Sequence, residues 1–115
     1  MSCEHLPGVT LVRVAGEADA LNAAQLETFL AHARRRPGEP LVLDLSELTF
    51  LGGGALRVLP RAHAVAEQHG TGLYLAAVRA APARLLELTG AWRHLRWYPS
   101  VEHALAATHG APDAA

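Results

Sequence analysis

Histidine and cysteine are the side chains in this sequence best suited to bind a metal ion, and the chain has seven histidines and one cysteine. His63 and His69 lie six residues apart, as do His103 and His109. A helix brings side chains to one face at spacings of three or four residues, so neither pair aligns two imidazoles as ligands. With Cys3 alone near the N-terminus, the spacing favours solvated surface histidines and predicts no metal site.

A hydrolytic enzyme needs a nucleophile close to a base, and this sequence shows no motif that supplies one. It lacks both G-x-S-x-G and C-x-x-C, and no hydroxyl side chain lies between Phe50 and Glu67. That stretch joins a predicted strand to a predicted helix, which is the junction where such folds place a nucleophile. We therefore predict that the protein is not an enzyme.

Three consecutive glycines, Gly52 to Gly54, form the most informative segment. Glycine permits a positive φ and a close approach of other backbone, and the helix expected to follow offers free N–H groups that could hold a phosphate. The chain has no Walker A motif, and Arg57 occupies the position where G-x-G-x-x-G requires its last glycine. An ordinary turn is favoured over an anion nest or nucleotide site, and both interpretations stay open.

Basic and aromatic residues give weaker indications of a partner. Arg34, Arg35 and Arg36 are expected in the last turn of a helix, where cations interact favourably with the helix dipole. Trp92 and Trp97 are equally consistent with anchors for a partner protein and with a cover at the edge of the core.

Composition places the chain among single globular domains. It has 115 residues, ten basic against eleven acidic side chains and a net charge of −1, so neither nucleic acid nor an anionic membrane is an expected partner. No apolar run approaches the roughly 20 residues of a membrane span, and the start MSCEHLPG does not resemble a signal peptide. We expect a cytoplasmic protein, and the single Cys3 excludes an internal disulfide.

Hydrophobic periodicity predicts strands alternating with helices. The strands are expected over 9–15, 41–45 and 73–78, with a short extended piece at 97–98, and the helices over 23–35, 55–68, 82–88 and 101–108. Asn22 and Gln25 resemble a capping box, and Gly90 is placed to end the third helix. Pro60 predicts either a kink or a helix that begins near Leu59.

Alternating strands and helices predict an α/β domain with a mostly parallel sheet, because parallel strands need crossover connections. We expect a flexible N-terminus over residues 1–8, one domain over 9–108 and a disordered tail over 109–115.

Five segments carry a joint resemblance to a known family. They are VRVAGEAD at 12–19, PLVLDLSELTFLGGGALRVL at 40–59, GLYLAAV at 72–78, RLLELTG at 84–90 and YPSVEHAL at 98–105. In this order and register they resemble a STAS domain, the fold of bacterial anti-sigma factor antagonists. The resemblance implies a mixed, mostly parallel sheet of about four to five strands with about four helices.

The resemblance also implies a protein-binding regulator without a cofactor, as a monomer or weak homodimer. In the family, an unmodified antagonist binds an anti-sigma factor, often a serine kinase of the histidine-kinase-like ATPase fold, and thereby frees a sigma factor. Phosphorylation of a serine at the start of the helix after the second core strand reverses the binding, because added charge disrupts a close interface.

This sequence departs from the family pattern at that switch. Gly52 stands where the family has Asp, Gly53 where it has the phosphoacceptor Ser, and Gly54 where it has a second hydroxyl. The resemblance implies that the partner-binding surface consists of the six residues Gly52, Gly53, Gly54, Ala55, Leu56 and Arg57.

Three consequences of this departure stay open. The chain could bind an anti-sigma factor permanently, or the surface could serve a different partner, such as a transport or other signalling complex. A displaced phosphorylation site at Ser46 or Thr49 is the least favoured, because an acceptor must be exposed at the interface. Asp44 is expected to support the glycine turn by accepting hydrogen bonds from its backbone, with Ser46 beside it.

Overall fold

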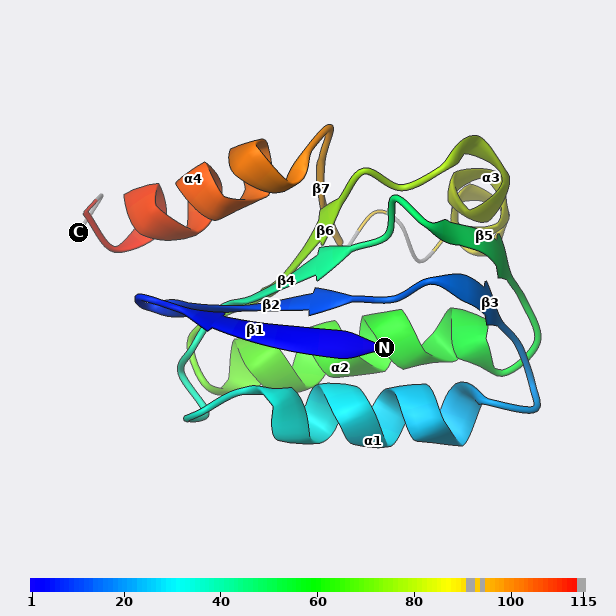
Figure 1. The fold of residues 1–115 in the computed structure, drawn as a ribbon, viewed down its shortest axis with the longest axis horizontal. Helices are drawn as coiled ribbons and strands as arrows, with labels where there is room; N and C mark the ends of the chain where they lie inside the picture. Colours follow the sequence, from blue (N-terminus) through cyan, green and yellow to red (C-terminus); the bar gives the residue numbers. More distant parts are fainter. Residues whose placement is uncertain (91–92, 94, 114–115) are drawn as a thin grey trace.

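A five-stranded sheet with helices packed on both faces forms the body of the molecule (Figure 1). The computed structural model describes residues 1–90, 93 and 95–113. In chain order its elements are β1 (Ser2–Leu6), β2 (Val9–Arg13), β3 (Gly16–Ala18), α1 (Ala23–Ala33), β4 (Leu41–Asp44), β5 (Leu48–Leu51), α2 (Ala55–Gln68), β6 (Leu73–Ala76), α3 (Ala80–Thr89), β7 (Arg96–Tyr98) and α4 (Val101–Asp113).

The strand order of this sheet is β1-β2-β4-β6-β7, and every pairing except that of β1 with β2 is parallel. The predicted α/β class and mostly parallel sheet are therefore confirmed. A second, two-stranded parallel sheet pairs β3 with β5 beyond the end of the main one. The sequence did not predict these short strands, because three or four residues give too little periodicity to recognise.

The strands β4 and β6 are buried on both faces because each face of the sheet has its own apolar cluster. On one face, Leu41 and Leu43 pack with residues of α1 and α2 such as Leu30 and Leu59. On the other, β-strand residues pack with Ala104 of α4. Figure 1 shows the same division, with α1 and α2 together below the sheet and α4 above it. Because helices cover both faces of β4 and β6, the sequences of these two strands are nearly continuous apolar runs.

The prediction of a flexible N-terminus over residues 1–8 is wrong, because residues Ser2–Leu6 form β1 and pair in antiparallel register with β2. Its side chains are exposed or half-buried, so SCEHL carries no alternating apolar pattern, and the strand is recognised only by its pairing in the folded chain. At the other end, α4 runs to Asp113, five residues past the predicted end, and so corrects the predicted tail over 109–113. Residues 114–115 lie outside the described residues.

Helix boundaries differ from the predictions in small, explicable ways. Helix α1 ends at Ala33 and leaves Arg34 as its C-cap. The side chain of Asn22 does not cap that helix, since its oxygen accepts from the Asp19 N–H and its amide donates to the carbonyl of Glu17. Helix α2 runs continuously from Ala55 through Pro60, so the alternative start near Leu59 is wrong. Gly90 ends α3 with φ of 76°, as predicted.

Candidate functional site: the glycine turn

The three glycines make the connection from β5 into α2, and backbone contacts fix its shape. The Gly52 N–H donates to the carbonyl of Ala18 at 2.9 Å, which ties the turn to β3. Gly53 has φ of +56°, and a Cβ added there would lie 3.2 Å from the backbone nitrogen of Ala20. This position therefore needs glycine for its conformation and for the close approach of the β3–α1 loop.

The first amides of α2 are already engaged within the turn. The N–H groups of Ala55, Leu56 and Arg57 donate to the carbonyls of the three preceding glycines, at 3.2, 3.3 and 3.2 Å respectively. An anion nest needs such donors pointing outward toward a ligand. Their use inside the turn weakens the anion-site interpretation and favours an ordinary, tightly wound start of the helix.

Of the six residues predicted to bind the partner, four are accessible to solvent. Gly53, Gly54 and Arg57 are exposed and Leu56 is partly exposed, whereas Gly52 and Ala55 are buried. Beside them lies a shallow hollow of about 560 Å³ between α2 and the end of α3, lined by Gly53, Leu56, Arg57, Pro60, Arg61 and Thr89. The turn thus combines exposed backbone with an adjoining depression, which suits contact with another protein.

Three exposed apolar side chains belong to segments that adjoin this turn, and sequence reasoning missed them. Leu21, in the loop next to Ala20, is 93% exposed, and Leu88, next to Thr89 on α3, is 76% exposed. Phe50 on β5 is 45% exposed, with its ring against the position of a Gly52 Cβ. We call Leu21, Phe50 and Leu88 the apolar collar. A signal existed for Leu88, because it falls outside the buried stripe of α3, whereas nothing in the periodicity marks Leu21.

The structure does not support the role predicted for Asp44. Its Oδ1 accepts from the N–H of Ser46 at 3.0 Å and its Oδ2 lies 3.4 Å from Nε of Arg13. The carboxylate therefore stabilises the β4–β5 turn, because an aspartate most readily bonds the backbone two residues further on. Ser46 is exposed in that turn, and its carbonyl accepts from Arg79. Thr49 is also exposed, and its hydroxyl donates to the carbonyl of Gly16 at 3.0 Å.

The histidine prediction is wrong at one position. His63 is 3% exposed, and its Nδ1 accepts from the N–H of Leu73 at 3.1 Å, which places its ring proton on Nε2, 3.5 Å from Glu67. A signal existed, because His63 lies on the buried stripe of α2, four residues after Leu59 and three before Ala66. Among the described residues, no group of three or more His, Cys, Asp or Glu side chains comes together as a metal site.

The tryptophan and arginine predictions have separate outcomes. Trp97 is partly buried and packs against the main core, in agreement with the core-edge interpretation. Trp92 lies outside the described residues. Arg34, Arg35 and Arg36 follow the end of α1 instead of forming its last turn.

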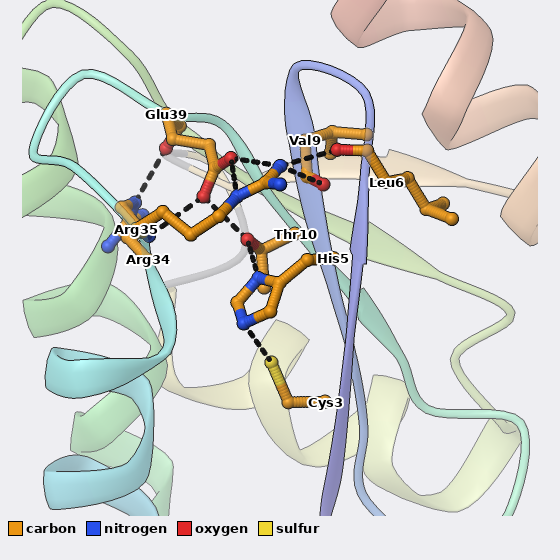
Figure 2. A network of polar contacts seen from close by, with 8 residues as sticks. All are labelled: Cys3, His5, Leu6, Val9, Thr10, Arg34, Arg35 and Glu39. Atoms are coloured by element: carbon orange, nitrogen blue, oxygen red, sulfur yellow. Dashed lines mark hydrogen bonds and ion pairs between the residues drawn. The ribbon is translucent and has the colours of Figure 1, made fainter.

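A buried carboxylate that the sequence did not single out binds one of these arginines, Arg35 (Figure 2). Glu39, 2% exposed, accepts from the Thr10 hydroxyl at 2.5 Å, from the Arg35 N–H at 3.0 Å and from Nε of Arg35 at 2.8 Å. Burial alone would raise the pKa of this carboxyl, but the hydrogen bonds and the charge of Arg35 outweigh it and lower the pKa to about 2. The Arg35 guanidinium also donates to the carbonyl of Leu6, so the network joins the β1–β2 hairpin to the α1–β4 loop.

Comparison with known proteins decides the family. The model of the STAS domain matches residues 1–104, nearly the whole chain. The chain belongs to the STAS domain family. Its STAS domain is 32% identical over 108 residues to the anti-sigma-F factor antagonist RsfA of Mycobacterium tuberculosis, covering 91% of this chain and 84% of that protein.

Two further relatives agree with this assignment. The anti-sigma F factor antagonist of Paenibacillus polymyxa is 29% identical, with 89% of this chain and 88% of that protein covered. The crystal structure of an anti-sigma factor antagonist from Mycobacterium paratuberculosis superimposes with a TM-score of 0.78 at 35% identity, covering 94% of this chain and 92% of that one. Among the helices described for this STAS domain, none has the length and apolar character to cross a membrane.

Proposed function

We propose that this STAS domain is an anti-sigma factor antagonist, a regulator that acts in the cytoplasm by binding an anti-sigma factor and is not an enzyme. Two of the relatives described above are named anti-sigma F factor antagonists, and the similarity to this chain covers 84% and 88% of their lengths. The observation that supports the binding surface is the exposed glycine turn, Gly53 and Gly54, with the apolar collar on the segments that adjoin it. Exposed apolar side chains grouped around accessible backbone are typical of a protein interface.

We further propose that binding here is not switched off by phosphorylation of the turn. Residues 52–54 are glycines and offer no hydroxyl as an acceptor. The nearest hydroxyl along the chain, that of Thr49, already donates to the Gly16 carbonyl. The turn is therefore small and uncharged at all times, a shape that keeps the surface open to an anti-sigma factor of the serine kinase type.

Affinity capture from a lysate of the native organism, with and without ATP, tests this function. We expect the tagged protein to retain an anti-sigma factor equally in both conditions. Gly53→Asp, which adds charge at the turn, should abolish capture, whereas Gly70→Asp should not, since Gly70 is another exposed left-handed glycine, at the opposite end of α2. Capture that falls with ATP would overturn the permanent-binding proposal, and absence of any anti-sigma factor would overturn the function.

A further inference from the structure

A cysteine, a histidine, a threonine and a glutamate form a chain of side-chain contacts across the β1–β2 hairpin and the loop before β4 (Figure 2). Cys3 and His5 are two residues apart on β1, so their side chains point to the same face of the strand. Thr10 of β2 is the cross-strand partner of His5, which places these two side chains beside each other. The Thr10 hydroxyl in turn contacts the buried Glu39. A nucleophile, a base and two orienting groups are therefore aligned, an arrangement that activates a cysteine.

The hydrogen bonds in this chain run in one direction, because its last member can only accept. The Glu39 carboxylate, whose pKa is lowered to about 2, is ionised at neutral pH and accepts the single hydroxyl proton of Thr10 at 2.5 Å. The Thr10 oxygen is left to accept, so its contact of 3.0 Å with Nδ1 of His5 places the ring proton on Nδ1. Nε2 of His5 then carries a lone pair, 3.8 Å from Sγ of Cys3. The network therefore fixes the tautomer in which the imidazole can accept the thiol proton.

The two ends of this chain differ in exposure, which separates the reacting group from the groups that orient it. Thr10 and Glu39 are buried, and Arg35 holds the Glu39 carboxylate in place with two further hydrogen bonds. Cys3 and His5 are exposed on β1, at the edge of the main sheet. A reagent in solution can therefore reach Sγ while the base stays oriented from inside the fold. Reactive cysteines are accessible thiols of this kind, whereas buried structural cysteines are inert.

We propose that Cys3 is a site of reversible S-thiolation, at which it exchanges with a low-molecular-weight disulfide and His5 acts as the base. Sγ gives its proton to Nε2 of His5 and attacks one sulfur of the small disulfide, so a bond to that sulfur forms as the original S–S bond breaks. The departing thiolate takes the proton from Nε2 and leaves as a thiol. Cys3 is thereby oxidised and the small disulfide is reduced. Since this sequence has one cysteine, no second thiol of the chain resolves the mixed disulfide, which persists until an external thiol reverses the exchange.

The rate at which the intact protein reacts with dithiodipyridine, an aromatic disulfide whose released thione absorbs ultraviolet light, tests the proposal. The folded protein should react at least about fivefold faster than the same protein unfolded in urea at the same pH, because unfolding releases His5 from Thr10. His5→Phe should lower the folded rate by about fivefold or more, while His103→Phe, the same change at an exposed histidine of α4, should alter it by less than about twofold. Incubation with oxidised glutathione should add one thiol to the mass of the protein, and a reductant should remove it. A folded rate no higher than the unfolded one, an unchanged rate in His5→Phe, or no adduct would overturn the proposal.

Thr10 is a positioning residue for His5, and two substitutions separate its hydroxyl from its packing. Thr10→Val keeps the shape of the buried side chain but removes the acceptor that fixes the His5 tautomer, so the rate should fall by about threefold or more. Thr10→Ser retains the hydroxyl and should react within about twofold of the parent rate. Circular dichroism establishes that both variants are folded, and His5→Phe decides the proposal if Thr10→Val is not. Equal rates in the two folded variants would overturn the directed chain from Glu39 to Cys3.

Discussion

The buried network around Glu39 and the glycine turn lie at opposite ends of β4, and they are built on different principles (Figure 1). Before β4, a buried carboxylate, a hydroxyl and two arginines fix a loop and a hairpin through side-chain hydrogen bonds. Beyond it, the glycine turn is held by backbone hydrogen bonds and presents apolar side chains to solvent. A charge network stabilises and orients its own chain, whereas a surface without such bonds is available to a partner. We therefore expect substitutions at the first end to change stability and those at the second to change binding.

Removal of the Glu39 carboxylate gives the largest expected effect. Glu39→Ala leaves Thr10 and the Arg35 guanidinium without their shared acceptor, so the free energy of unfolding should fall by about 3–5 kcal/mol. Urea denaturation monitored by circular dichroism measures it. The matched control is Glu47→Ala, at an exposed glutamate, which should stay within about 0.5 kcal/mol of the parent. A Glu39→Ala loss as small as the control's would show that the network orients the hairpin without stabilising it.

The pH dependence of stability tests whether the ionised Glu39 carboxylate is the group that stabilises the fold. The pKa of Glu39 is lowered to about 2 in the folded protein, against an ordinary value of 4.5. The unfolded chain takes up the proton first, so this stabilisation is complete above about pH 5 and is lost as the pH falls toward 2, by an amount on the order of 3 kcal/mol. Unfolding free energies of the parent and of Glu39→Gln, measured from pH 6 to pH 2.5, should therefore converge at low pH. A constant difference between the two proteins would assign the stabilisation to another group.

Within the glycine turn, two neighbouring glycines should respond in opposite directions. Gly53→Ala forces a side chain into a positive φ and within 3.3 Å of the Ala20 Cβ, so it should cost about 1–2 kcal/mol. Gly54→Ala should be neutral or stabilise by up to about 1 kcal/mol, because Gly54 has helical angles and its added Cβ meets Ala23 at an ordinary 3.7 Å. Thermal unfolding of both variants measures the difference. Equal effects would mean that the turn adapts to a side chain at either position.

The sequence predicted the parts of this structure that depend on periodicity and on turn chemistry. Local patterns of this kind marked four features: the strands 41–45 and 73–78, the helix that begins at Ala55, and the Gly90 cap. Strand β1 has no such pattern, because its residues are exposed and its partner is found only in the folded chain. The glycine turn was found from its three consecutive glycines, and the resemblance then gave it a role as the partner-binding surface.

Long-range contacts explain why the rest escaped prediction. Glu39 lies in a Pro- and Gly-rich loop that reads as solvent-exposed, and its burial depends on Thr10, 29 residues away. Asp44 was assigned to the glycine turn, but the nearer backbone of Ser46 competes successfully for its carboxylate. The apolar collar combines residues from a loop, a strand and a helix, so no single periodic pattern contains it.

The smallest expected change in stability accompanies the most direct test of the collar. Leu88→Ser removes an apolar side chain that is 76% exposed, so the free energy of unfolding should change by less than about 0.5 kcal/mol. Capture of the anti-sigma factor should nevertheless weaken by about fivefold or more, because an exposed leucine beside the binding surface becomes buried in the complex. Val65→Ser is the matched control, since Val65 is also half exposed but lines a separate hollow between α1 and α2. If both variants bind the partner as the parent does, the collar is not part of the interface, and the contact must be carried by the exposed backbone of the turn and by α2.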